Sequence, residues 1–332
     1  ADLLTGHEVA WYLECYDKIL SGEIDAGQWR SDLGSGEPEK RASVENITHL
    51  SNLPTPRRDA TARYEYDDLG GEALNVAVPL ATWGLRVAVA GNLIGTDRKA
   101  EFIRRELASH PGIDASYIIQ HPNVTTPFTR VLVTPDGERS RIAYWFDEAP
   151  KDELLRSTMA RAKVLGVDAY GKDERDRAAQ IARELGKTVI TADAIWPQYP
   201  LAGTSDVVII SSTWLQTNFP GVFDYDHALD LQSRGAGVVI ITDGAKAVLV
   251  VRADGSAFGI EPYTVRRVVD TSSAGDLFKA GIIYGWLHPD WPLEQKVKFA
   301  CAAAGLNCER DRSKEPPPSL DEILALMRAQ PR

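Results

Sequence analysis

The sequence has few of the features that would mark a secreted or metal-binding protein. It contains three cysteines, Cys15, Cys301 and Cys308, and no C-x-x-C spacing. An odd number of dispersed cysteines argues against a disulfide framework and a zinc site, and it fits a reducing compartment. The six histidines are scattered without the spacing of metal ligands. Metal-binding residues therefore stay unassigned.

Long apolar runs and an excess of positive charge are also missing. No apolar stretch approaches the roughly 20 residues of a membrane helix, and the start lacks the basic and then apolar pattern of a signal peptide. Cytoplasm is therefore the expected location. The formal net charge of -10 argues against a nucleic-acid partner. No G-x-G-x-x-G follows an early strand, which argues against a Rossmann dehydrogenase. The expected partner is a small molecule.

What is present is the pattern of an α/β protein. From Gly84 onward, short apolar segments alternate with amphipathic ones. Such alternation predicts a doubly wound, mostly parallel sheet covered by helices on both faces. The predicted strands are Arg86–Ala90, Lys163–Val167, Thr188–Thr191, Val207–Ile210 and Val238–Thr242. The predicted helices between them are Glu101–Ser109, Glu174–Leu185 and Tyr225–Ser233.

Two segments interrupt this alternation. Thr61–Asp67 and Phe128–Trp145 have the every-second-residue pattern of half-exposed strands, and Thr134–Gly137 has the composition of a hairpin turn. We expect a small antiparallel β lid. The prediction is one domain over residues 1–332, with lid segments at about 54–68 and 117–146.

The two ends differ in clarity. Residues 1–52 form an atypical N-terminal segment, in which Leu3–Gly6 suits a short strand and Glu8–Leu20 suits a helix. Near the other end, Lys296–Asn307 is alanine-rich and predicts a helix. Ser319 follows three prolines and is expected to cap a final helix that runs to Met327.

The segment Val268–Gly281 is the most informative for chemistry. The segment starts with an apolar pair, continues with small residues and is expected to become helical at about Asp276. Small residues at a helix start bring backbone N–H groups close to an anion. A carboxylate there can accept a proton from a hydroxyl while those groups stabilise a transferred phosphoryl group. The same residues also suit a tightly packed helix start that carries an ordinary N-terminal acid.

Several motifs, in this order, resemble those of the ribokinase-like (PfkB) carbohydrate kinases. Asp270–Asp276 is similar to D-T-x-G-A-G-D, with Ser273 where the family usually has Gly. Gly70–Ala77 is similar to the substrate-side motif G-G-x-x-x-N-x-A. Trp83–Leu85 and Gly91–Asp97 resemble the L-G and G-x-x-G-x-D elements. The resemblance covers roughly Val44 to Met327.

The resemblance implies a role for each matching residue. Asp276 would be the general base, and Ser273, Ala274 and Gly275 would donate backbone N–H groups to the phosphoryl oxygens. The pocket for the sugar-like substrate would be lined by Gly70, Gly71 and Asn75. The nucleotide side would include Thr242, Gly244, Thr271 and Cys301.

Each of these roles has a plainer alternative. Gly70 and Gly71 also suit a turn into a helix that Asn75 caps. The turn after Thr242 also suits any strand end, and Cys301 also suits a small buried apolar position.

The resemblance further implies ATP and Mg²⁺, although three departures matter. The N-x-x-E element is missing, since Ile210–Leu215 stands in its place. Arg312 lies near the position of a usual Gly, which argues against a monovalent cation. The usual N-terminal substrate-binding Asp is also unassigned. Gly6 with Trp11, Asp17 and Glu45 are the candidates considered.

The expected activity is ATP-dependent phosphorylation of a hydroxyl on a sugar or sugar-like molecule. The alternatives are a non-catalytic homologue with a regulatory role and a nucleoside kinase. Related kinases often dimerise through the lid. We therefore expect a homodimer with Tyr144, Trp145 or Phe146 at the contact.

Overall fold

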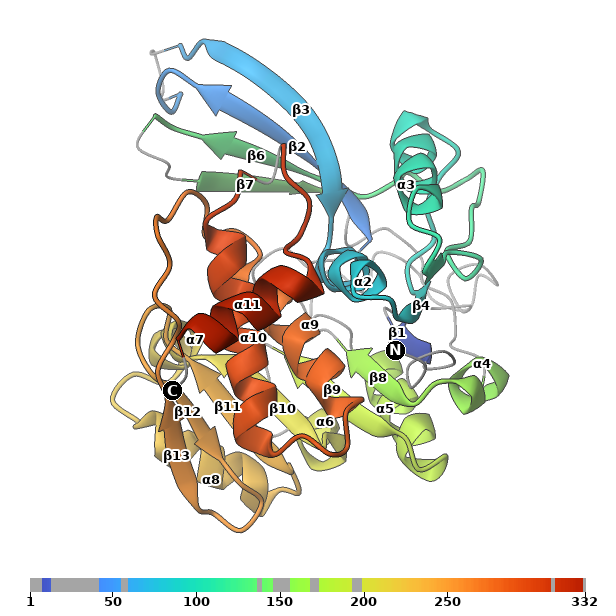
Figure 1. Ribbon diagram of the computed structural model, residues 1–332. Coiled ribbons are helices and arrows are strands. Elements are labelled where there is room, and N and C mark those ends of the chain that lie inside the picture. Colours follow the sequence, from blue (N-terminus) through green and yellow to red (C-terminus); the bar gives the residue numbers. More distant parts are fainter. Residues whose placement is uncertain are drawn as a thin grey trace.

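The computed structural model describes residues 8–12, 42–54, 59–135, 139–145, 156–167, 173–192, 199–311 and 314–330. Within these residues, nine strands form a large sheet and four form a smaller one (Figure 1). The large sheet has the order β13-β12-β11-β10-β9-β8-β1-β4-β5. Its pairs are parallel from β5 to β11, and β12 and β13 add antiparallel strands at one edge. The strands are β1 (Glu8–Tyr12), β4 (Arg86–Ala90), β5 (Ile113–Asp114), β8 (Val164–Val167), β9 (Thr188–Ala192), β10 (Val207–Ser211), β11 (Val238–Thr242), β12 (Val248–Val251) and β13 (Ala257–Ile260).

Helices cover both faces of the large sheet. Alternate residues of a strand join different core clusters, as Val164 and Leu165 do on β8. One layer holds α2, α9 and α10, and the other holds α4, α5, α7 and α8. This is the doubly wound α/β arrangement that the sequence predicts. The helices are α2 (Glu72–Thr82), α3 (Arg98–Ala108), α4 (Arg156–Arg161), α5 (Asp173–Glu184), α6 (Pro200–Thr204), α7 (Ser212–Asn218), α8 (Asp224–Ser233), α9 (Ala274–Trp286), α10 (Leu293–Cys308) and α11 (Leu320–Ala329).

The N-terminal prediction needs one correction. Glu8–Tyr12 is not helical but forms β1, a strand in the middle of the large sheet. It pairs in parallel with β4 on one side and with β8 on the other. Two rows of inter-strand hydrogen bonds outweigh a local preference for helix in this segment. Leu3–Gly6 lies outside the described residues.

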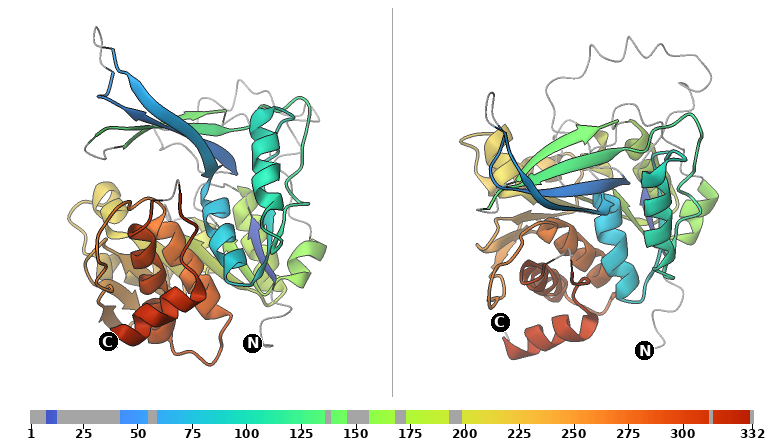
Figure 2. Two further views of the ribbon diagram at one scale, coloured as in Figure 1. Left: turned by 45° about the horizontal axis from the view of Figure 1, so that its top comes forward. Right: turned by 90° about the horizontal axis from the view of Figure 1, so that it is seen from above.

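The smaller sheet, which we call the lid, stands above the large sheet in Figure 1 and in the left view of Figure 2. It consists of β2 (Ser43–Leu50), β3 (Ala62–Gly70), β6 (Phe128–Val133) and β7 (Arg139–Tyr144), in the order β3-β2-β6-β7. Its pairs are antiparallel except for the parallel pair of β2 and β6. Sequence reasoning found the other three strands but placed β2 in the N-terminal segment.

The lid has two distinct faces because side chains alternate along each strand. Ile47, Tyr66 and Val131 are neighbours in register and pack together on one face. Arg139 shares this face and reaches the helical body, so we call it the body face. Thr48 and Leu132 belong to the opposite, outer face.

Both predicted C-terminal helices are present, although α10 starts three residues earlier than predicted and α11 ends at Ala329 instead of Met327. Ser319 caps α11 through a reciprocal capping box with Glu322. Among the helices of the described residues, none has the length and apolar character needed to span a membrane.

Candidate functional site

Asp276 lies in the first turn of α9, beside backbone N–H groups that are free to bind an anion. The N–H of Leu277 donates to the carbonyl of Ser273 at 2.9 Å, so the helical hydrogen bonds start there. Within the described residues, the N–H groups of Gly275 and Asp276 have no acceptor. Such donors at a helix start attract a negatively charged group. Gly275 is also exposed, which keeps this end of α9 accessible.

Ser273 holds a backbone conformation that usually belongs to glycine. It is the N-cap residue of α9, with φ 54° and ψ 14° in the left-handed region. A side chain in this region costs about 1–2 kcal/mol. The substitution at the family's usual glycine therefore preserves the turn and stores strain beside Asp276.

Asn75 and Asp276, predicted from two motifs far apart in the chain, meet directly. The Asn75 side-chain amide Nδ2 donates a hydrogen bond to Asp276 Oδ2 at 2.9 Å. Asn75 lies on α2, which packs against α9. The bond orients the Asp276 carboxylate and leaves its Oδ1 atom for another hydrogen-bonding partner.

The paired glycines lie at the junction of the lid and α2. Gly71 is the N-cap residue of α2 with φ 91°, a value that favours glycine. A Cβ on Gly70 would lie 2.7 Å from Glu45 Cγ and 2.9 Å from Ser43 Oγ. A side chain at residue 70 would therefore require β2 side chains to shift, and Glu45, one of the candidate substrate acids, lies beside the motif. Asp17 and Gly6 lie outside the described residues, and Trp11 belongs to β1.

An ion pair connects the lid to the segment that precedes α9. Arg139 Nη2 on β7 lies 2.8 Å from Asp270 Oδ2, with 24% and 17% of the two side chains exposed. Asp270 also accepts a hydrogen bond from the Ser272 N–H at 2.8 Å. Burial would raise the pKa of Asp270, but the Ser272 hydrogen bonds and the Arg139 guanidinium together lower it below its usual value. Asp270 is therefore charged at neutral pH and holds Arg139.

The residues assigned to the nucleotide side are spread over three elements. Thr242 ends β11, and Gly244 lies in the following turn with φ 56°. Thr271 is exposed, and its carbonyl accepts from the Ala274 N–H at 3.2 Å. Cys301 lies in the core on α10, where burial raises the pKa of its thiol to about 12. None of the four is hydrogen-bonded to Asp276 within the described residues.

Sequence reasoning missed charged residues around the site. Arg139 was treated only as part of a lid strand, and Glu72 and Lys279 were not considered. Lys279 and Glu72 form an ion pair with 1% and 2% of their side chains exposed. A single lysine within the apolar run after Asp276 was the available signal.

No preformed metal centre is found at the site. In the described residues, no group of three or more His, Cys, Asp or Glu side chains is arranged to hold a metal ion. In the place of the missing N-x-x-E element, Ser211 caps α7. Mg²⁺ is often held largely by substrate phosphates and water, which needs no such cluster.

Comparison with known proteins identifies the class of this chain. Residues 59–320 match the profile of the pfkB family carbohydrate kinases. The chain is therefore a kinase, and it belongs to the pfkB family of carbohydrate kinases.

Curated relatives differ in substrate. The chain is 25% identical over 315 residues to a 5-dehydro-2-deoxygluconokinase of Lacticaseibacillus casei, covering 86% of this chain and 93% of the relative. It is 25% identical over 305 residues to a nucleoside kinase of Methanothermobacter thermautotrophicus, covering 86% and 92%. An ATP-dependent ribose-1-phosphate kinase of Halopiger xanaduensis is 25% identical over 288 residues, covering 84% and 93%.

Solved structures confirm the ribokinase-like fold. Arabidopsis thaliana ribokinase complexed with ribose and ATP superposes with a TM-score of 0.77 at 17% identity, covering 97% of this chain and 98% of that one. Ribokinase from Thermotoga maritima gives a TM-score of 0.75 at 18% identity, covering 97% and 99%.

Proposed function

We propose that this kinase transfers the γ-phosphoryl group of ATP to a hydroxyl of a sugar or sugar-like molecule at the start of α9. The observation that carries this proposal is the Asn75–Asp276 hydrogen bond beside the N–H groups of Gly275 and Asp276. It combines a carboxylate, an orienting amide and anion-binding donors in one place.

The residues divide the chemistry between them. ATP would supply the phosphoryl group, and Mg²⁺ would neutralise part of its charge. Asp276 Oδ1 accepts the proton of the acceptor hydroxyl, while Asn75 holds Oδ2. The N–H groups at the start of α9 stabilise the charge on the phosphoryl oxygens. An Escherichia coli protein described as ribokinase II was solved with ATP and Mg²⁺, which supports the use of both.

The test is a screen for ADP release with Mg²⁺-ATP across sugars, sugar acids and nucleosides. We expect one class of acceptor to raise ADP release well above the rate with ATP alone, with the product phosphorylated at a hydroxyl. No acceptor-dependent ADP release from any class would favour a non-catalytic homologue.

A nucleoside acceptor is the second candidate because aromatic rings stack on the body face of the lid. The His49 ring lies 4.2 Å from that of Tyr64 and 6.2 Å from that of Tyr66, between centroids. Burial and the nearby Arg139 lower the pKa of His49, so its ring is neutral at pH 7. A nucleobase could stack on Tyr64, which is 55% exposed. Preference for nucleosides over free sugars in the screen would support this candidate.

Relief of the strain at Ser273 gives a prediction about the anion-binding turn. Ser273→Gly should keep turnover similar or raise it somewhat, and the melting temperature should stay equal or rise by a few degrees. Gly removes the left-handed cost of about 1–2 kcal/mol but adds about 0.5–1 kcal/mol of unfolded-chain entropy. Thermal melts and kcat measure both effects.

Ser273→Ala is the matched control because it keeps the Cβ and removes only the hydroxyl. It should be no more stable than the native protein. A tenfold loss of kcat in Ser273→Gly would show that the Ser273 side chain takes part in the reaction.

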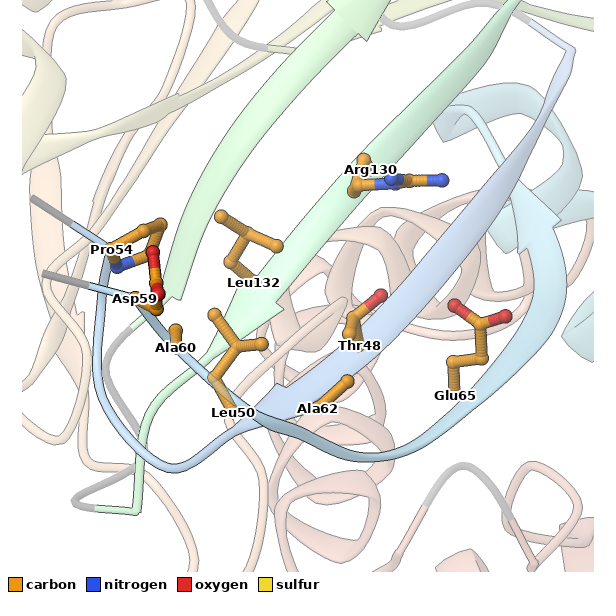
Figure 3. A pocket seen from close by; sticks show the side chains of 9 residues that line it. All are labelled: Thr48, Leu50, Pro54, Asp59, Ala60, Ala62, Glu65, Arg130 and Leu132. Atoms are coloured by element: carbon orange, nitrogen blue, oxygen red, sulfur yellow. The ribbon is translucent and has the colours of Figure 1, made fainter.

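We also propose that the protein is a homodimer through the outer face of the lid. A hollow of about 450 Å³ lies there, lined by Thr48, Leu50 and Leu132 among others (Figure 3). On the same face Ile142 is 44% exposed. Trp145, the residue after the end of β7, is 45% exposed. Phe146 lies outside the described residues. Exposed apolar side chains beside a hollow suit a protein contact.

Light scattering at micromolar concentration should give the mass of a dimer, and Ile142→Asp should reduce it to that of a monomer. Phe223→Asp is the control, since Phe223 is 78% exposed but lies next to α8, outside the lid. A native protein that is monomeric with and without acceptor would contradict the dimer.

A further inference from the structure

A buried ion pair lies one helical turn behind the Asn75–Asp276 contact. Lys279 occupies the apolar part of α9, where Leu277 through Gly285 are buried. Its ammonium group pairs with Glu72, the first residue of α2. Lys279 Nζ also donates to the carbonyl oxygen of Val167, the last residue of β8, at 3.1 Å. One side chain thus connects α9, the start of α2 and a strand end.

The spacing of these residues couples the ion pair to the site. Lys279 follows Asp276 by three residues on α9, and Asn75 follows Glu72 by three on α2. Residues three apart on a helix face the same side, with Cβ atoms roughly 5–6 Å apart. The helices α2 and α9 are therefore connected twice on facing sides, by Glu72–Lys279 and by Asn75–Asp276.

Stability alone is a weak reason for such a pair. The cost of removing two charges from water can exceed their attraction, and apolar replacements of similar volume are often neutral or stabilising. What a buried pair does enforce is geometry, because a displaced partner would leave a charge without compensation. Here the enforced geometry is that of the first turn of α2, which follows Gly70 and Gly71 and carries Asn75.

We propose that Lys279 and Glu72 are positioning residues for the reaction. By holding the first turn of α2 against α9 and the end of β8, they keep Asn75 within hydrogen-bonding distance of Asp276. The inference rests on the proposed role of Asp276 as the base. It adds that the orientation of the Asp276 carboxylate depends on an ion pair that itself contacts neither the acceptor nor ATP.

The decisive variant is the neutral double variant Glu72→Gln/Lys279→Met, compared with Lys279→Met alone. The single variant leaves the Glu72 carboxylate buried without its cation, so it should lower the melting temperature. The double variant removes both charges and should recover most of that loss. Turnover should remain about 10- to 100-fold below the native value in both, because a shift of about 1 Å in a reacting group has an effect of that size.

Kinetics and structure give separate readouts. With the best acceptor of the screen, kcat should fall and KM for ATP should stay within about twofold, a factor worth only ~0.4 kcal/mol. Crystal structures of the native protein and the double variant need no acceptor. They should show the 2.9 Å contact between Asn75 Nδ2 and Asp276 Oδ2 broken in the variant.

Lys296→Met is the matched control for loss of a buried lysine. Lys296 on α10 is 8% exposed, and its Nζ donates to the carbonyl oxygens of Gly285 and His288 at 2.6 Å each. Gly285 lies near the other end of α9, about 13.5 Å along the helix from Asp276, and His288 follows the helix. The variant should melt at a lower temperature with unchanged kcat.

Native turnover in the double variant, or an intact Asn75–Asp276 contact in its crystal structure, would overturn the positioning role. Asp276→Asn separates this failure from failure of the proposed function. An inactive Asp276→Asn beside a fully active double variant rejects only the positioning role. Full activity in Asp276→Asn rejects Asp276 as the base.

Discussion

Asp276→Asn is expected to lower kcat by about two to four orders of magnitude, the usual contribution of a general base. The change removes the basic oxygen but almost nothing else. An Asn side chain has the same shape, and its carbonyl oxygen can still accept the hydrogen bond from Asn75 Nδ2. The N–H groups of Gly275 and residue 276 are also unchanged, so ATP should bind with its native KM. Steady-state kinetics with the acceptor from the screen, together with a thermal melt, measure the effect.

Asp97→Asn is the control for loss of an acid at a helix start. The Asp97 side chain caps α3, accepting from the N–H groups of Lys99 and Ala100 at 3.0 Å each. It should lower stability by about 1–3 kcal/mol, because Asn remains a good N-cap but its NH2 group replaces the oxygen that accepts from the Thr126 N–H at 3.0 Å. It should leave kcat unchanged. If Asp276→Asn turned over at a rate close to that of the native protein, another group would have to be the base.

The sequence was sufficient for the parts of the fold that depend on local pattern. The predicted bounds of Arg86–Ala90 and Val238–Thr242 match β4 and β11, because short β-branched runs between helices suit a buried parallel strand. Ser319 was recognised as a cap because Ser is a preferred N-cap residue and stands between three prolines and a helical pattern. The structure adds the reciprocal bond from Glu322. Local chemistry decides such features.

Local pattern was insufficient where distant pairing decides the structure. Glu8–Tyr12 is a strand because β4 and β8 flank it, and both come much later in the chain. Ser43–Leu50 contains Asn46, Thr48 and His49, which weaken its apolar alternation, yet it pairs with β3 and β6 in the lid.

The site shows the same division between local and distant features. Motif resemblance indicated Asn75 and Asp276, but their hydrogen bond joins residues 201 positions apart. Lys279 and Glu72 are 207 positions apart, so neither could be paired with the other from the sequence. Likewise, Asp270 belongs to a recognised motif, but its partner Arg139 comes from the lid. The N-terminal substrate-binding Asp also could not be assigned from the sequence, because its assignment depends on where the first strand ends. That strand, β1, ends at Tyr12, five positions before Asp17.

Trp83→Ala is expected to have the largest effect on stability. Trp83 follows α2 and is 2% exposed. Its ring meets those of Tyr284 and Phe299 edge to face, with centroids 5.7 and 5.5 Å away. Its indole Nε1 donates to the Pro318 carbonyl at 2.8 Å, which joins α2 to the segment before α11. Removing a buried Trp side chain usually costs about 3–5 kcal/mol, a large part of the roughly 5–15 kcal/mol that keeps a domain folded.

Trp83→Phe separates the ring from its hydrogen bond. Phe keeps an aromatic group against Tyr284 and Phe299 but leaves the buried Pro318 carbonyl without this donor, at a cost of about 1–3 kcal/mol. Urea unfolding followed by circular dichroism should therefore rank the native protein above Trp83→Phe and Trp83→Ala last. The urea concentration at the midpoint of unfolding should fall in both variants. The slope of the unfolding free energy against urea concentration should change little. A loss below 1 kcal/mol in Trp83→Ala would mean that α2 is held chiefly by its contacts with α9, including the Glu72–Lys279 pair, and not by this aromatic cluster.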